Sequence, residues 1–424
     1  WFISPEQLDQ LGPVLGRGAV WLNESVADDE PSDPFLIDGF ATRSLHLVSD
    51  VATTITLEID TEGNDRWRKL LDIEVDGYRW LELDAELDAS WIRLRSSAPL
   101  TKATASFHLA GKDDRPATPR ANLFNGIVTG ESREGENIVG GLIRARGGNK
   151  RTLQLAAESN DGKIGNYILN SQMQLEPDGD DTAWQWLQKN AAIPPREGVL
   201  EADAASVIYT DDSGRRFRLP RNPEYEQAGP LGFGRLCREV ATERDLFNCH
   251  GTFFELPANN AGGFARVRPV ATHGLHIHDY CSYRGLLVIS GIDLSKGEDN
   301  RHIIRSEDGK AAVWVGAIDD IWQLGKPHGV GGPWKETTVK ADELSDPYLM
   351  TGYDRKTLTL SASKTTTITA QIDITGMDNW HDWKTFELEP GTPVNEVFPT
   401  AFGAYWIRFQ SSQPATVTAQ LRYE

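Results

Sequence analysis

The seven residues Thr54-Ile55-Thr56-Leu57-Glu58-Ile59-Asp60 decide the fold class of this chain. Apolar and polar side chains alternate along them, and a period of two places Ile55, Leu57 and Ile59 on one face of a β-strand. The same alternation returns much later in the chain, at Ile368, Ala370, Ile372 and Ile374. Both segments are therefore predicted to be strands that bury one face.

The sequence around these two strands is repeated. Ser32-Asp33-Pro34-Phe35-Leu36 matches Ser345-Asp346-Pro347-Tyr348-Leu349, and Trp67 matches Trp380, at one constant offset of 313 positions. After small gaps the match resumes, with Trp91 opposite Trp406. Strands at intervals of about 8–12 residues, separated by Gly, Asp or Pro, are typical of a β-sandwich. We predict two copies of one β-sandwich module, at residues 13–112 and 327–424, with the matched tryptophans as core residues.

The middle of the chain, residues 113–326, has a different β-rich pattern. Strands at Ala205–Thr210 and Arg216–Leu219 flank an Asp-Asp-Ser-Gly turn, and strands at Arg301–Ser306 and Ala311–Gly316 flank an Asp-Gly turn. Such turns are strong hairpin signals, and repeated hairpins indicate β-propeller blades. The fold class expected for the whole chain is all-β: a β-propeller, incomplete in this chain, with two duplicated β-sandwich modules.

The sequence also predicts a partial propeller blade at its start and one helix in its middle. Trp1 matches Trp314 at the same offset, so residues 1–12 are expected to be the last strand of a blade. An upstream polypeptide segment or a second chain would then complete the propeller. The one convincing helix is expected at Thr182–Asn190, with Asp180 and Asp181 capping its start.

Charge and hydropathy limit the functions that fit. The formal net charge is −19, which argues against nucleic acid as a partner because phosphate binding needs a dominant basic surface. No apolar run reaches the ~18 residues of a membrane helix, so no membrane insertion is expected.

Groups able to do chemistry are concentrated between Cys237 and Arg284. This stretch holds all three cysteines and four of the nine histidines. The wider window from Gly214 to Arg284 has ten arginines, no lysine and seven acidic residues, a local charge of +3 within an acidic chain. If the protein is an enzyme, its site is expected here.

A metal site is one interpretation of this stretch. Histidine and cysteine are natural zinc ligands, but their spacing fits no compact zinc signature. Inert buried thiols and hydrogen-bonded histidines are the favoured alternative, so no cofactor is required, and a structural zinc or calcium ion is the secondary hypothesis. Its candidate ligands are Cys237, Cys249, His276, His278 and Cys281.

Proton transfer beside an anion is the other interpretation. β-Elimination from a uronic acid needs a base for the C5 proton, an acid for the leaving oxygen, and a cation that neutralises the adjacent carboxylate. Histidine, tyrosine and arginine supply these groups. If residues 276–284 form one strand, His276, His278 and Tyr280 share one face. The arginine-rich window favours anion capture, with candidate substrate-binding residues Arg238, Arg244, Arg266, Arg268 and Glu255.

Two motifs carry a resemblance to a known family. R-E-V-x-T-E-R-x-L-F-N-x-H-G-T-F-F-E-L-P spans Arg238–Pro257, and T-H-x5-D-Y-C-S-Y-R-G spans Thr272–Gly285. Over about 120 residues the chain resembles secreted bacterial β-propeller enzymes of polysaccharide utilisation, distantly similar to rhamnosyl-glucuronate lyases, ulvan lyases and propeller α-L-rhamnosidases. The resemblance implies an extracellular or periplasmic location and a partner that is an anionic polysaccharide or oligosaccharide containing uronic acid and rhamnose. By residue type, it implies the catalytic candidates His250, His273, Tyr280, Tyr283 and Arg284.

The most favoured function is therefore a polysaccharide lyase acting by β-elimination. A glycoside hydrolase on the same fold is one alternative, and it requires two carboxylates that face the scissile bond. A non-catalytic glycan-binding protein is another, and a structural protein stapled by its Cys and His residues is the last.

Overall fold

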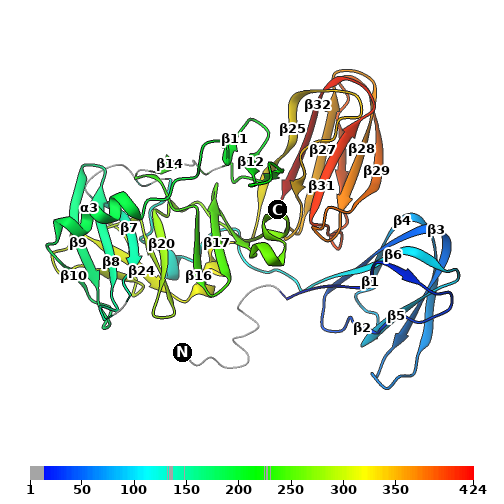
Figure 1. Ribbon diagram of the computed structural model, residues 1–424, viewed down its shortest axis with the longest axis horizontal. Helices are drawn as coiled ribbons and strands as arrows, with labels where there is room; N and C mark the ends of the chain where they lie inside the picture. The colour runs from blue at the N-terminus through cyan, green and yellow to red at the C-terminus, as the bar shows by residue number, and fades with distance from the viewer. Residues whose placement is uncertain are drawn as a thin grey trace. The chain divides into compact units, whose positions relative to one another are not determined.

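The computed structural model describes residues 14–130, 132, 137–147, 149–223, 225, 228–229 and 231–424. The chain is all-β, with strands far outnumbering short helices, as the alternating segments predict (Figure 1). Contacts divide it into two compact units, which join the described residues up to Asp114 with Trp334–Ala419, and Arg115–Pro333 with Gln420–Glu424. These divisions fall close to the sequence boundaries at 112/113 and 326/327. The strand expected at residues 1–12 lies outside the described residues.

The first segment of unit 1 is a six-stranded antiparallel sheet. Its order is β1 (Leu15–Val26), β6 (Leu100–Ala110), β3 (Thr42–Asp60), β5 (Trp91–Ser96) and β2 (Phe35–Leu36), and β4 (Arg68–Leu83) pairs with β3. The apolar face of β3, with Ile55, Leu57 and Ile59 buried, packs into one core as the sequence predicts. The long β3 pairs with β6 through its first half and with β5 through its second half, so one strand serves two layers.

The second segment of unit 1 contains the same strand pairs. β26 (Tyr348–Leu349), β31 (Trp406–Ser411), β28 (Thr366–Asp373) and β29 (Trp380–Leu388) form one run, and β25 (Gly329–Val339), β32 (Ala415–Tyr423), β27 (Lys356–Ala362) and β30 (Val394–Val397) form another. A bend at 363–365 separates β27 from β28, where β3 continues with only a register shift. Of the matched tryptophans, Trp406 is buried in the core, whereas Trp91 is half-buried beside Gly63.

One loop of unit 1 occurs twice with the same hydrogen bonds. The Asp60 carboxylate accepts the backbone N–H groups of Gly63 and Asp65, and Asp373 accepts those of Gly376 and Asp378 at the matched positions. In both loops the following tryptophan, Trp67 or Trp380, donates its indole N–H to the second aspartate and lies under an arginine. A buried carboxylate that satisfies consecutive backbone donors fixes the loop without a disulfide.

An aromatic face of the first segment packs on the second. His46, Tyr78 and Trp80 come from β3 and β4, and the rings of His46 and Trp80 lie 5.6 and 5.5 Å from the ring of Phe402. Nearby, the Ser44 hydroxyl donates to the Ala401 carbonyl over 2.8 Å. At an offset of 313, Thr359 stands where the first segment has His46, and Thr359 donates instead to Asn395 on an exposed surface. The two segments thus present different faces.

Within the described residues, unit 2 contains three sheets of four or five strands and several short elements. One sheet has the order β10 (Leu175–Pro177), β9 (Gly162–Leu169), β8 (Leu153–Ser159), β7 (Ile138–Ala145) and β22 (Ile292–Asp293). The second is β16 (Cys237–Ala241), β17 (Arg244–Cys249), β18 (Thr252–Leu256) and β19 (Arg268–Thr272). The third is β20 (Asp279–Tyr283), β21 (Leu286–Ser290), β24 (Ala312–Gly316) and β23 (Ile303–Arg305). Shared apolar clusters join the third sheet to each of the others.

Short elements complete unit 2. Helix α2 (Ala121–Phe124) precedes the sheets, and α3 (Asp181–Asn190) lies against β7, β8 and β9 (Figure 1). β11 (Leu200–Ala202) pairs with β12 (Val207–Thr210), which pairs with β13 (Arg216–Leu219), and β14 (Ala228–Gly229) pairs with β15 (Gly232–Phe233). Three 3-10 turns cover Asn259–Ala261, Gly263–Arg266 and Ile318–Leu324.

Some sheets of unit 2 have the strand order expected of a propeller blade, and others do not. Both predicted hairpins form, with Val207 opposite Leu219 and Ile303 opposite Trp314. The predicted helix is confirmed as α3, and the Asp180 side chain accepts the Ala183 N–H at its start. The sheet β16–β19 runs in chain order, as a blade does. The sheet containing β20 and β21 does not, because β22 leaves it to pair with β7 and the chain returns as β23 at the outer edge.

Candidate functional site

A cavity of about 830 Å³ in unit 2 is lined by several polar groups that could act on a ligand. Ligand sites typically measure about 300–1,000 Å³. Its walls come from the α2 region, from the loop after β19, and from single residues of more distant segments. The titratable lining residues are His273, His276, His328 and Lys296, and the neutral polar ones are Thr118, Asn125, Thr129, Ser132 and Asn222. His273 and His328, which are 55 positions apart in the sequence, therefore meet at one cavity.

His273 is held in one tautomer. Its Nδ1 accepts the N–H of Leu275 over 3.1 Å, so Nε2 carries the proton and lies 3.2 Å from the Asn248 side-chain oxygen. Burial, with smaller contributions from the neighbouring His276 and His328, lowers the pKa of His273 to about 3. His273 is therefore a neutral wall residue whose two ring nitrogens are already engaged.

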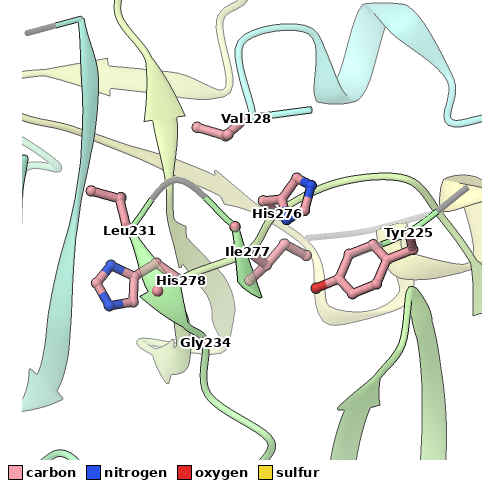
Figure 2. A pocket seen from close by; sticks show the side chains of 9 residues that line it. Val128, Tyr225, Leu231, Gly234, His276, Ile277 and His278 are labelled. Atoms are coloured by element: carbon pink, nitrogen blue, oxygen red, sulfur yellow. The ribbon is translucent and has the colours of Figure 1, made fainter. Parts of the chain in front are cut away.

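His276 lies between this cavity and a smaller hollow. The hollow has room for about one water molecule and is lined by Tyr225, Leu231, His276 and His278, among others (Figure 2). The imidazole of His276 stacks on the Tyr225 ring with centroids 4.9 Å apart and an interplanar angle of 18°. Figure 2 shows His276 and His278 leaving the backbone in different directions, one toward Tyr225 and one toward Leu231. Burial raises the pKa of Tyr225, which keeps its hydroxyl protonated.

His328 and Lys296 enter the cavity from segments outside the histidine-rich stretch. The Nδ1 of His328 is 3.0 Å from the Lys326 carbonyl oxygen, and a carbonyl only accepts, so Nδ1 is the donor. In the neutral ring Nε2 then keeps its lone pair. The Lys296 ammonium lies 3.6 Å from the Asp293 carboxylate, which also accepts the Ser132 hydroxyl over 3.1 Å.

Residues 276–284 do not form the one strand that would place His276, His278 and Tyr280 on the same face. Strand β20 begins at Asp279, and the backbone from His276 to His278 belongs to no strand. The irregular backbone turns His278 toward the sheet of β7, where its Nδ1 accepts the Gly141 N–H over 3.1 Å. Its Nε2 is 3.5 Å from a Glu158 oxygen. His276 and Tyr280 therefore do not share the face that alternation would give them.

Two of the predicted catalytic residues are core residues. Tyr280 is fully buried, and its hydroxyl lies 2.7 Å from the Leu246 carbonyl oxygen, to which it donates. Burial raises the pKa of Tyr280 well above its ordinary value. Tyr283 is also buried and donates to the Arg151 carbonyl over 2.9 Å. Both hydroxyls are directed at backbone oxygens, so their positions do not support the predicted proton transfer.

The other three catalytic candidates lie in different places. His250 occupies the tight turn between β17 and β18 with a φ of 45°, and burial lowers its pKa to about 4. Arg284 occupies the exposed turn between β20 and β21. Of the five, only His273 lines the large cavity.

The predicted substrate-binding arginines are mostly engaged within the protein. Arg238 donates to the backbone carbonyls of Ile143 and Tyr280. Arg244 and Arg268 both form ion pairs with Glu255, so the Glu255 carboxylate bridges the two arginines. Arg266 is half-buried in a 3-10 turn, with its side-chain carbons close to Gly262. Most of these arginines are therefore used in contacts within the protein, and they do not form one binding surface.

The most deeply buried ion pair among the described residues was not predicted. Arg235 donates its Nε to the Asp279 carboxylate over 2.9 Å, and both side chains are almost entirely buried. The same carboxylate accepts the N–H groups of Ile143 and Tyr280 over 2.8 Å each. Asp279 therefore joins β7, β20 and the loop before β16 from inside the core.

The predicted metal ligands do not form a cluster among the residues that the structure describes. Within those residues, no group of three or more His, Cys, Asp or Glu side chains is placed to hold an ion. Cys249 and Cys281 are buried thiols, Cys237 is exposed, and the Cys281 sulfur contacts the Ser282 carbonyl oxygen over 3.2 Å. Burial raises the pKa of Cys249 and Cys281, which disfavours the thiolate that binds zinc.

His328 and Lys296 were missed by sequence reasoning because they lie outside the arginine-rich window. The repeat carries a usable signal for His328. At the offset of 313, His328 stands opposite Leu15, so a polar ring replaces an apolar residue next to the matched pair Gly16 and Gly329. Lys296 has no comparable signal.

Comparisons with known proteins give no family for this chain. No protein-family model matches it, and no curated protein matches its sequence. Among solved structures, the exported protein XepA of PBSX covers 96% of this chain and 86% of its own, at 6% identity and a TM-score of 0.18. A glycoside hydrolase of family 32 from Bifidobacterium adolescentis covers 94% and 99%, at 8% identity and a TM-score of 0.15. Procruciferin from Brassica napus covers 100% and 78%, at 9% identity and a TM-score of 0.17. Similarities at these TM-scores carry no argument about fold or function.

Proposed function

We propose that this protein is a polysaccharide lyase that cleaves a uronate-containing glycan by β-elimination in the large cavity of unit 2. The observation that carries the proposal is the convergence of His276, His328 and Lys296 on one cavity of suitable size. The resemblance to secreted enzymes of polysaccharide utilisation supports the substrate class and an extracellular or periplasmic location.

The proposed chemistry assigns one role to each residue. Lys296 pairs with the uronate carboxylate, which makes the C5 proton more acidic. The Nε2 of His328 takes that proton, because its Nδ1–H is already donated to the Lys326 carbonyl. The C4–O bond then breaks as the C4–C5 double bond forms. His276 gives a proton to the departing oxygen, which leaves as a hydroxyl group.

Hydrogen bonding around the cavity supports these roles. His273 fills the wall between its neighbours as a neutral ring and holds the loop through Leu275 and Asn248. The Asp293 carboxylate lies beside the Lys296 ammonium and holds it at the cavity wall. Asn222 and Ser132 offer hydrogen bonds to sugar hydroxyl groups at the same wall.

The test is cleavage of uronate-containing polysaccharides, followed by the ultraviolet absorbance of the unsaturated product. The variants H328Q and K296M are expected to lower kcat/KM by about 100-fold or more, the usual contribution of a general base or a charge-stabilising group. H250N is the matched control, because His250 does not line the cavity and asparagine tolerates its positive φ.

Each outcome separates the alternatives. Release of reducing ends without the unsaturated product would replace the lyase with a hydrolase. Binding without cleavage would make the protein a glycan-binding module. Activity that disappears in H250N but survives in H328Q would return the site to the residues predicted from sequence.

The finer fold assignments are part of the same proposal. We propose that residues 13–112 and 327–424 are two copies of one sandwich module, and the paired Asp60 and Asp373 loops support this. For residues 113–326, the chain-order sheet β16–β19 supports a blade-like organisation, and the strand order around β20 does not.

A further inference from the structure

A basic groove in unit 2 carries features of a second ligand site. It has a volume of about 340 Å³ and shares no lining residue with the histidine cavity. Arg144, Arg146 and Lys150 provide its charge, and Trp186 from α3 provides an aromatic wall. From 137 to 157 the sequence has four basic residues and no acidic one, in a chain of net charge −19. The groove is therefore locally cationic on an acidic protein.

The fold explains why these residues meet. Leu142 and Ala156 on β7 and β8 pack under Leu187 of α3, which covers that face of the sheet. Arg144 follows two positions after Leu142, so it extends the same face toward the end of β7. Gln154 stands directly opposite Arg144 on β8 and donates to Asn166, which in turn donates to Asp178. The groove floor is thus a sheet surface held by a hydrogen-bonded chain.

The aromatic wall is positioned by the helix. Asp180 caps α3 by accepting the Ala183 N–H over 3.0 Å, which fixes the first turn. One turn later the Arg144 guanidinium lies 3.9 Å from the centre of the Trp186 ring. Trp186 nevertheless remains 43% exposed, unusually open for so large an apolar side chain. An exposed indole beside guanidinium groups suits a ligand with both an apolar ring face and negative charge.

We propose that this groove binds an anionic glycan, with its carboxylate or sulfate groups on Arg144, Arg146 and Lys150 and a sugar ring against Trp186. Arginine offers parallel N–H donors to either anion, and the apolar face of a sugar packs on an indole. The inference does not rest on cleavage in the histidine cavity, because binding at the groove is measured without any reaction.

Isothermal titration calorimetry with polygalacturonate, dextran sulfate and uncharged dextran tests this proposal. The variant R146Q/K150Q is expected to weaken binding of the charged polymers by about tenfold or more, since two of the three cations are lost. W186A is expected to weaken it as well. K189Q removes an exposed charge from the same helix outside the groove and should bind as the wild type does. Comparing the two charged polymers identifies whether carboxylate or sulfate is preferred.

A second background keeps the two sites distinguishable. In K296M/H328Q the histidine cavity is altered, and groove binding should persist there and still be lost on adding R146Q/K150Q. The proposal is overturned if the wild type binds neither charged polymer, if dextran binds equally well, or if R146Q/K150Q binds like the wild type. Preferential binding of a single-stranded oligonucleotide would overturn the glycan assignment in favour of nucleic acid.

Discussion

At the scale of single residues, Asp279 is the residue on which the core of unit 2 depends most. Its carboxylate accepts hydrogen bonds from Arg235 and from two backbone N–H groups while fully buried. Removing one partner of a buried pair leaves the other charge unpaired, which typically costs about 3–5 kcal/mol. We expect D279N to lower the free energy of unfolding of unit 2 by that amount.

Urea denaturation followed by circular dichroism measures this change. The matched control is D114N, which breaks the exposed ion pair between Asp114 and Lys112. Exposed pairs contribute little to stability, so D114N should unfold at the wild-type urea concentration. Equal effects of the two variants would show that Arg235 finds another partner or water when Asp279 is neutralised.

His273 predicts a dependence of stability on pH. Burial lowers its pKa from 6.5 to about 3, so the folded protein keeps it neutral while the unfolded chain takes up a proton below pH 6.5. Because the unfolded state then binds more protons, stability falls as the pH decreases through this range. Between pH 6.5 and 5 one such histidine accounts for about 2 kcal/mol.

Denaturation of the wild type and H273Q at pH 7, 6 and 5 tests the sign and the size of this change in stability with pH. Glutamine does not titrate, so H273Q is expected to lose stability less steeply over this range, even though it is less stable at pH 7. Parallel pH profiles for the two proteins would contradict the assignment of this dependence to His273.

At the scale of elements, the two aspartate loops link local sequence to the stability of the two segments of unit 1. Asp373 satisfies backbone donors of residues 375–378 while buried, and hydrogen bonds to a charged group contribute about 1.5–3 kcal/mol. D373A is expected to destabilise unit 1 by at least that amount. D60A should act in the same direction through the matched loop.

E387Q provides the control for D373A, because Glu387 is exposed on the neighbouring strand β29. The measurement is the midpoint of thermal unfolding for each variant. A D373A midpoint equal to that of E387Q would mean that water replaces the carboxylate in this loop.

Strands with regularly alternating apolar and polar residues were predicted well from the sequence. The positions of the candidate site residues were not. Alternation located β3 and β28, and the turn residues located β13 with both bounds correct, because these signals depend only on near neighbours. The segment from His273 to His278 is irregular, so no period fixes where its side chains point. Tyr280 looked chemically suitable, yet only the tertiary structure shows its hydroxyl bound to Leu246.

Long-range convergence explains the remaining failures. The cavity joins His273 to His328 and Lys296, and a single sequence holds no information on which distant segments meet. The prediction that the arginine-rich window binds an anion failed for a related reason. Arg235, Arg244 and Arg268 are balanced by acids that lie 44, 11 and 13 positions away, so the pairs become visible only in the folded chain.

At the scale of the whole molecule, the two compact units predict two unfolding events. Each unit has its own apolar core, and most contacts fall within a unit. Differential scanning calorimetry is expected to show two transitions, with D279N lowering the one that belongs to unit 2 and D373A lowering the other. A single transition moved by both variants would show that the units unfold together.

The aromatic contact inside unit 1 has a consequence for self-association. His46 and Trp80 of the first segment meet Phe402 of the second, so the contact is heterologous: it joins two unlike patches of related folds. Such contacts propagate into open filaments when every copy carries both patches. In the first segment His46 stands opposite Trp80 on the neighbouring strand, and in the second segment Thr359 stands opposite Asn395 and donates to it. The second segment has no matching aromatic patch at these positions, so we expect stacking of this kind to end after one step and not to continue from one molecule to the next.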